Sequence, residues 1–246
     1  MVDFTTPPKS VLRPVGRVIA RYGMIRHGDR VMLGLSGGKD SLSLLQVLGH
    51  LRRHAPVSFD LAAITVDPQI EGFDPSVLAP YLRDLGVPYY YEREDLEGLA
   101  GRSMKKDSFC SFCARIKRGI MYRVMRDEGY GVLALGQHLD DLAESFMMSA
   151  FHEGRLNTMK AHYRVDAGDI RVVRPLVAVR ERQLRDFAQT AGLPVVQDSC
   201  PACFTKPTQR AHMKGLLAAE ETRNPHLFKT LLRAMEPLIA RDGGPM

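Results

Sequence analysis

The sequence predicts an α/β protein: a doubly wound, mostly parallel sheet with helices on both faces, an N-terminal helix and a helical C-terminal tail. The main observation is that apolar runs of strand length alternate with stretches whose apolar residues recur at helical spacing. A second observation is the glycine-rich segment at 33–43, which joins an apolar run to such a helical stretch. A strand, a tight turn and a helix N-terminus follow one another there.

The chain opens with a basic amphipathic helix, expected within residues 1–28. Val11, Val15 and Val18 recur at helical spacing among arginines, and no acidic residue occurs between positions 9 and 27. A transit peptide is also basic and free of acids, but the regular apolar spacing favours a helix that docks on the protein.

The remaining elements alternate as a parallel sheet requires. Strands are expected at 31–35, 59–66, 87–91, 131–136 and 170–173, and helices at 42–48, 75–85, 109–128, 140–151, 181–191 and 209–239. We therefore expect a central α/β domain over residues 29–198 and a C-terminal segment over residues 199–246. In such sheets ligands bind at the carboxyl ends of strands, where the turns at 36–41 and 136–138 lie.

Composition and charge limit the classes of protein that fit. With 45% hydrophobic and 25% charged residues, the composition is ordinary for a soluble protein. No apolar stretch approaches the roughly 20 residues of a membrane span. The net charge of +6 favours an anionic partner, nucleic acid first. We find no secretory signal and therefore expect a reducing, cytoplasmic compartment without disulfides.

The turn at 36–41, Ser-Gly-Gly-Lys-Asp-Ser, has the properties of a phosphate site. Gly37 and Gly38 let the backbone approach a ligand closely, and the first N–H groups of the following helix have no partner within it. Such a helix start attracts anions. The turn is not a Walker A loop, because Leu33 stands in place of its first glycine and Asp40 in place of its Ser or Thr. The alternative is a helix N-cap without a ligand.

All four cysteines fall into C-x-x-C pairs: Cys110 with Cys113, and Cys200 with Cys203. This spacing lets both sulfurs of a pair reach one metal. From the residues alone, a structural zinc site with four cysteine ligands is one interpretation, and a redox C-x-x-C is another. The two pairs lie far apart in the sequence, so the fold would have to assemble any shared site.

Several stretches together resemble the tRNA 2-thiocytidine synthetases, a PP-loop family of the ATP pyrophosphatases that thiolates cytidine in the tRNA anticodon loop. They are Leu-Ser-Gly-Gly-Lys-Asp-Ser at 35–41, Cys-Ser-Phe-Cys-Ala-Arg-Ile-Lys-Arg-Gly at 110–119, Gly-Gln-His-Leu-Asp-Asp at 136–141, Arg-Pro-Leu at 174–176, Cys-Pro-Ala-Cys at 200–203 and Gln-Arg at 209–210. One departure is Gln137, where the family pattern leads us to expect His.

The resemblance implies a Rossmann-like PP-loop fold and a [4Fe-4S] cluster on three cysteines, which leaves one iron open. Cys110 and Cys113 carry over as ligands, and Cys200 is the third by its place in the motif, with Cys203 as the alternative. The implied reaction uses ATP to adenylate the C2 oxygen of cytidine 32 in tRNA numbering. Sulfur from a cysteine desulfurase or another sulfide donor then replaces that oxygen, which gives AMP and pyrophosphate.

Roles for single residues follow from this chemistry. The expected ATP-binding residues are Ser36, Gly37, Gly38, Lys39, Asp40, Ser41 and Gly136. We expect Lys39 to supply charge against the pyrophosphate, and Asp40 and Asp141 to orient Mg²⁺. The expected tRNA contacts are Lys117, Arg118 and Arg123, although a solvated helix face would look the same.

Other readings remain open at this point. Asp140 and His138 lie at the start of a predicted helix, where their role can be to stabilise that helix without taking part in the reaction. The chain could also be another PP-loop adenylating tRNA modifier, or an amide synthetase, with structural zinc on the cysteines. A non-catalytic RNA-binding module is a third class. The sequence leaves the oligomeric state open, a homodimer included.

Overall fold

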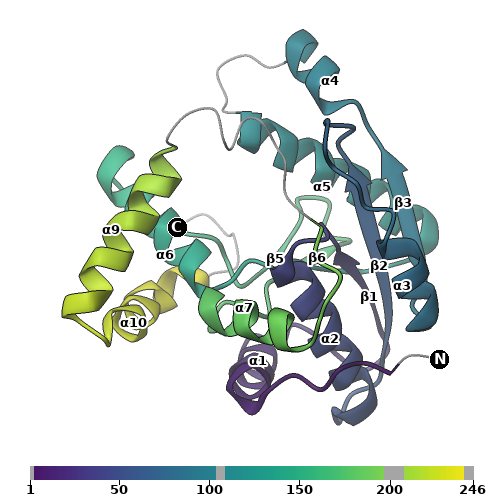
Figure 1. Ribbon diagram of the computed structural model, residues 1–246, viewed down its shortest axis with the longest axis horizontal. Helices are drawn as coiled ribbons and strands as arrows, with labels where there is room; N and C mark the ends of the chain where they lie inside the picture. Colours follow the sequence, from purple (N-terminus) through teal and green to yellow (C-terminus); the bar gives the residue numbers. More distant parts are fainter. Residues whose placement is uncertain (1–2, 104–108, 197–207, 241–246) are drawn as a thin grey trace.

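The computed structural model describes residues 3–103, 109–196 and 208–240, and within them six strands form one sheet (Figure 1). Their order is β3-β2-β1-β4-β6-β5, and all neighbours pair in parallel except β5 with β6. The strands are β1 (Asp29–Gly34), β2 (Phe59–Asp67), β3 (Tyr89–Arg93), β4 (Val132–Ala134), β5 (His162–Arg164) and β6 (Arg171–Val173).

Among the described elements, helices precede, separate and follow these strands, except that β5 leads directly to β6. The helices are α1 (Lys9–Arg21), α2 (Lys39–His54), α3 (Leu78–Asp84), α4 (Leu96–Ser103), α5 (Phe109–Glu128), α6 (Leu139–His152), α7 (Glu181–Thr190), α9 (Gln209–Arg223) and α10 (Leu227–Ile239). In the described part of the chain, none of them is long and apolar enough to span a membrane.

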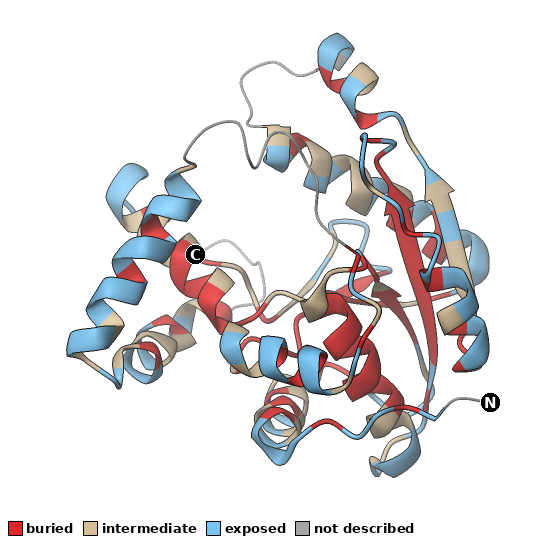
Figure 2. Cartoon of the chain, viewed as in Figure 1, coloured by how far each residue is buried: buried red, intermediate tan, exposed pale blue. Residues whose placement is uncertain are grey.

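Apolar cores lie on both faces of the sheet, which confirms the doubly wound prediction. Alternate residues of a strand point to opposite faces. In β1 the fully buried Val31 therefore joins one core, which also holds Leu45 of α2 and Leu184 of α7, while Met32 joins the other core with Met125 of α5. Figure 2 shows the buried residues concentrated in β1, β2 and α2.

The order of strands reverses at β1. The chain runs from β1 outward through β2 to β3, and β4 then pairs on the other side of β1. Because successive connections leave β1 and β4 toward opposite sides, a crevice opens at the carboxyl ends of these two strands. The 36–41 loop follows β1, and residues 136–138 follow β4, so both predicted turns lie at this crevice.

Some predicted elements differ from the structure. The third strand begins at Tyr89 rather than at 87, because Pro88 has no N–H to donate to a ladder. The expected tail helix is two helices, α9 and α10, broken at Asn224 before Pro225, since proline disfavours the helical conformation of the residue before it. The helix predicted at 75–85 begins at Leu78. Strand β5 and helix α4 were not predicted.

Helices α9 and α10 are attached to the α/β body by Arg180, at the N-cap of α7. Its guanidinium lies 3.0 Å from a carboxylate oxygen of Asp140 in α6 and 2.5 Å from one of Glu221 in α9. It also lies 3.3 Å from the ring centroid of Phe228 in α10. One mostly buried cation thus joins four helices.

We predict that Arg180→Ala lowers the free energy of unfolding by about 3 kcal/mol, because two partly buried carboxylates lose their partner. Urea unfolding followed by circular dichroism measures this. Arg182→Ala is the matched control: Arg182 contacts the same Glu221 at 3.6 Å but is 62% exposed, so its loss should cost less than about 1 kcal/mol. If the two variants lost equal free energy of unfolding, Arg180 would not be the residue that attaches α9 and α10.

Candidate active site

The 36–41 loop is closed on itself and leaves the start of α2 open. The Ser41 hydroxyl donates to the Gly38 carbonyl at 2.9 Å, and the Ser36 and Ser41 hydroxyl oxygens lie 3.1 Å apart. In the part of the chain that the structure describes, no side chain caps the N-terminus of α2. Its first N–H groups are therefore available to an anion, as the sequence predicts.

Two glycines make this geometry feasible. Gly37 has a φ of +83°, and a Cβ there would lie 2.7 Å from Val196 Cγ2. Gly136 follows β4, and a Cβ on it would lie 3.2 Å from the backbone nitrogen of Ser41. Larger residues would strain the loop at the first position and push the two turns apart at the second.

A cavity of about 500 Å³ lies over the loop, and we call it the loop cavity. Its lining comes from the carboxyl ends of β1, β2 and β4 and from α2, α5, α6 and α9. The residues are Gly34, Leu35, Ser36, Asp40, Ser41, Ile64, Val66, Ala114, Lys117, Arg118, Met121, Leu135, Gly136, Gln137, Asp141 and Arg210. The size suits a nucleotide-sized ligand.

Lys39 is held by acidic side chains beside this cavity and does not line it. Its ammonium lies 3.0 Å from Glu181 and 3.1 Å from Asp40. Burial lowers the pKa of Lys39, but these two carboxylates outweigh it and raise that pKa above its ordinary value. Glu181 also accepts from Lys214 of α9 at 2.7 Å. Sequence reasoning missed Glu181 and Lys214.

Asp40 and Asp141 both reach the cavity, one from each turn. Asp40 Oδ1 is buried and has no hydrogen-bond partner among the described residues, and burial raises the pKa of this carboxyl despite His138 and Lys39. Asp141 accepts from Arg210 at 2.8 Å. An unpartnered buried carboxylate oxygen fits a hard cation such as Mg²⁺. Within the described residues no group of three His, Cys, Asp or Glu could hold a metal, so phosphate oxygens would have to complete that site.

His138 and Asp140 have structural tasks. The backbone N–H of His138 donates to Asp141 at 3.0 Å, and its ring accepts from the Asp141 N–H at 3.4 Å, which forms a capping box on α6. Asp140 accepts from Arg180 and from the N–H of Glu181 at 2.7 Å. His138 therefore caps the start of α6, and Asp140 connects α6 to the start of α7.

Cys110 and Cys113 lie in the first turn of α5, where Cys110 is exposed and Cys113 half-buried. Residues three apart in a helix lie on the same face. Further along α5, Lys117 and Arg118 line the loop cavity. The helix that carries the thiols is thus one wall of that cavity. Cys200 and Cys203 lie outside the described residues.

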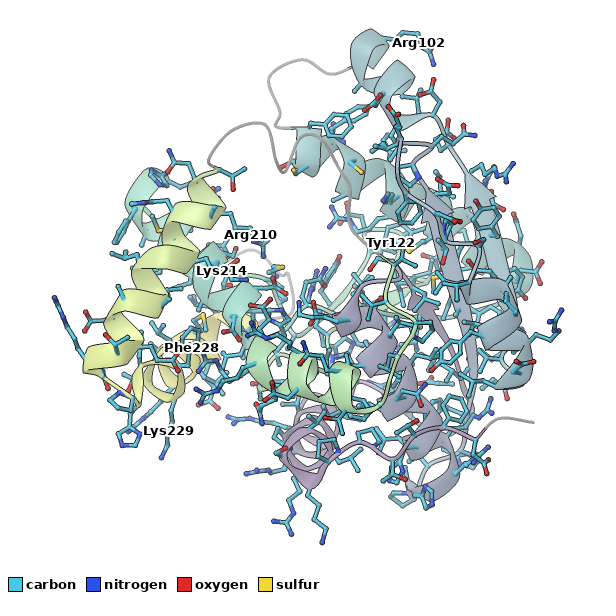
Figure 3. The ribbon with its side chains drawn as sticks, viewed as in Figure 1. Arg102, Tyr122, Arg210, Lys214, Phe228 and Lys229 are labelled. Atoms are coloured by element: carbon cyan, nitrogen blue, oxygen red, sulfur yellow. The ribbon has the colours of Figure 1, made fainter. Side chains whose placement is uncertain are left out.

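Arg210 of α9 pairs with two carboxylates of α6. Besides Asp141, it donates to Glu144 at 2.7 Å. Burial lowers the pKa of Arg210, while Asp141, Glu144 and Cys110 raise it, with a net increase. Arg210 and Lys214 extend from α9 toward the α/β body (Figure 3). The C-terminal helices therefore complete the site.

The three predicted tRNA contacts differ in position. Lys117 and Arg118 line the loop cavity. Arg123 instead pairs with Glu92 of β3 at 2.7 Å and is largely exposed.

The sequence is similar to those of known proteins. Residues 11–213 match the family model of the PP-loop domain. The tRNA-cytidine(32) 2-sulfurtransferase of Geobacter sulfurreducens is 42% identical over 228 residues, which cover 92% of this chain and 89% of that protein. The enzyme of the same name from Burkholderia cenocepacia is 36% identical over 94% of this chain and 70% of its own length.

Solved structures share the fold. The U34-tRNA thiolase NcsA of Methanococcus maripaludis, described with its [4Fe-4S] cluster, superposes with a TM-score of 0.75 at 24% identity, over 96% of this chain and 81% of that one. An NH3-dependent NAD synthetase from Campylobacter jejuni gives a TM-score of 0.51 at 17% identity, over 94% and 92%.

The ion pairs of Glu181 predict a pH-dependent stability. Burial alone would raise the pKa of Glu181, but Lys214 and Lys39 lower it to about 2 from the ordinary 4.5. The stabilisation is therefore fully present above pH 4.5 and is lost as the pH falls from 4.5 toward 2. We expect Glu181→Gln to lower the free energy of unfolding by about 2 kcal/mol at pH 7 and by progressively less below pH 4.5.

Urea unfolding of both proteins between pH 3 and pH 7 measures the difference. Glu220→Gln, at an exposed position of α9, serves as the control and should change little at any pH. A Glu181→Gln effect that is constant over this pH range would show that the charge of Glu181 is not responsible.

Proposed function

The chain belongs to the tRNA-cytidine(32) 2-sulfurtransferase family of PP-loop proteins, and on this basis we propose that it replaces the C2 oxygen of cytidine 32 in tRNA by sulfur. It is a PP-loop enzyme of ATP-dependent tRNA thiolation. The single observation that best supports the finer proposal is the wall of the loop cavity. The 36–41 loop and the helix of Cys110 and Cys113 bound one space, so activation and sulfur delivery can act on one base.

The reaction needs activation because the C2 oxygen is a poor leaving group. In the first step this oxygen attacks the α-phosphorus of ATP, a new P–O bond forms, and pyrophosphate leaves. In the second step sulfide attacks C2, the C2–O bond breaks, and AMP leaves with the former C2 oxygen. No electron is gained or lost overall.

The loop residues bind and orient the nucleotide in this proposal. The open N–H groups at the start of α2, with Ser36 and Ser41, contact the phosphates. Lys39, fixed beside the loop by Glu181, adds positive charge where negative charge develops on the leaving pyrophosphate. Asp40 and Asp141 would hold Mg²⁺ between their carboxylates and the phosphate oxygens.

The cysteines would hold the [4Fe-4S] cluster, with Cys110 and Cys113 as two ligands and Cys200, or alternatively Cys203, as the third. When bound, such a cluster supplies an iron that carries sulfide.

The partners follow from the reaction. The substrate tRNA would approach the side of α5 where Lys117 and Arg118 lie. A sulfide donor such as a cysteine desulfurase would supply the sulfur, in the cytoplasm. Electrostatic contact with the tRNA backbone would appear as an affinity that falls with rising salt.

We predict that Lys39→Ala reduces thiolation at least about 100-fold while tRNA affinity stays within about twofold, because the charge acts on the leaving group. Mass spectrometry of tRNA nucleosides measures thiolation, and filter binding measures affinity. Lys229→Ala, at an exposed position of α10, should change neither. Unchanged thiolation in Lys39→Ala would exclude the proposed role.

The metal content tests the cluster. Protein purified without oxygen should contain about four irons and four sulfides per chain, and Cys110→Ser and Cys113→Ser should each lose most of this iron while ATP binding persists. One zinc and no iron would instead favour a PP-loop adenylating tRNA modifier, or an amide synthetase, with structural zinc.

A further inference from the structure

A second cavity of about 680 Å³ lies next to the loop cavity, and we call it the arginine cavity. It opens between α5 and the β5–β6 edge of the sheet. Arg118 lines both cavities. The other residues that matter here are Arg115, Tyr122, Lys160, Tyr163 and Arg174. Asp166 is the one acidic residue in its described lining, against five basic ones.

Arg174 is built into the wall of this cavity and is only 4% exposed. Its Nε donates to Gln137 Oε1 at 2.9 Å, and its Nη1 donates to the Lys160 carbonyl at 2.6 Å. The guanidinium carbon lies 5.5 Å from the centroid of the Tyr163 ring. Arg174 follows β6 directly, so it is at the carboxyl edge of the sheet, like the 36–41 loop.

The charge of Arg174 has no acidic counterpart in the described chain. Its hydrogen-bond acceptors are neutral: the Gln137 amide oxygen, the Lys160 carbonyl oxygen and the Tyr163 hydroxyl. No carboxylate of the described residues lies within ion-pair distance of it. Burying a guanidinium in this way is unfavourable unless further acceptors reach its remaining N–H groups. A ligand with strong acceptors in the cavity would supply them.

The hydrogen bond between Arg174 and Gln137 forms the boundary of the two cavities. Gln137 lines the loop cavity, while Arg174 lines the arginine cavity. A group bound to Arg174 therefore lies one side chain away from the space we assign to ATP. This also gives a task to Gln137, the residue that departs from the expected family pattern: its amide oxygen positions the guanidinium.

We propose that the arginine cavity binds the target pyrimidine of the RNA substrate, with the base against Tyr163 and Arg174 and the adjoining phosphates at Arg115 and Lys160. This rests on the proposed function. Bases of single-stranded RNA loops stack on aromatic rings, guanidinium N–H groups donate to base edges, and arginine and lysine bind the phosphates. N3 of cytosine accepts a hydrogen bond, whereas N3 of uracil donates one. The Arg174 donors therefore favour cytosine.

Cross-linking tests the location. An anticodon stem–loop RNA with 5-iodocytidine at the target position is bound to the cluster-containing protein with ATP present, irradiated, and mapped by mass spectrometry. We expect cross-links at Tyr163 or Tyr122. Cross-links confined to other residues, or none although the RNA is bound, would overturn the inference and leave the proposed function intact. No binding of the RNA at all would overturn the proposed function itself.

Variants test the two contacts separately. Tyr163→Leu should weaken binding of the stem–loop about tenfold, while Tyr163→Phe, which keeps the ring, should bind like the parent. Arg174→Lys should reduce the preference for cytidine over uridine at the target position at least about fivefold. Arg164→Lys, in the exposed lining of the same cavity, is its control.

ATP binding, measured with a fluorescent analogue, should be the same in all four variants and reports that they fold. Equal RNA affinity of Tyr163→Leu and Tyr163→Phe would overturn the stacking contact. An unchanged cytidine preference in a folded Arg174→Lys protein would overturn the role of Arg174 in recognising the base.

Discussion

The pairing of β1 with β2 on one side and β4 on the other is the constraint on which the site depends. It opens the crevice where the 36–41 loop and residues 136–138 meet, and the missing Cβ of Gly136 allows them to lie in contact. Asp40 from one turn and Asp141 from the other then reach the same cavity, although a hundred residues separate them. Without this strand order the two carboxylates would lie at separate edges.

Charged side chains of the C-terminal helices complete that crevice. Arg180 attaches α9 and α10 to α6 and α7, which brings Arg210 and Lys214 to the carboxylates around the loop. Glu181 is shared between Lys214 and Lys39, so the docking of α9 and the position of the loop lysine are linked. A change in how α9 packs would therefore alter the position of Lys39 beside the 36–41 loop, through the carboxylate of Glu181.

Helix α5 carries two of the cysteines and also lines both cavities. Its first turn carries Cys110 and Cys113, its middle lines the loop cavity, and Arg118 and Tyr122 line the arginine cavity. A single rigid element thus fixes the spacing between the thiols, the space assigned to ATP and the space assigned to the base. Sulfur delivery to an activated base requires such a fixed spacing, because reacting atoms must be held within contact distance.

Features that depend on local chemistry could be predicted from the order of the amino acids. The alternation of strands and helices, the glycines of the 36–41 loop and the cysteine pair on α5 follow from periodicity, backbone freedom and spacing. Contacts between side chains far apart in the chain could not be predicted in this way: Glu181 with Lys39, Arg174 with Gln137, and Arg210 with Asp141. These contacts depend on how the helices pack against one another. The sequence pattern of a helix does not distinguish a charged residue that faces solvent from one that pairs with another side chain. The three-residue strand β5 escaped prediction for a similar reason, since its pairing with β6, rather than a local apolar pattern, makes it a strand.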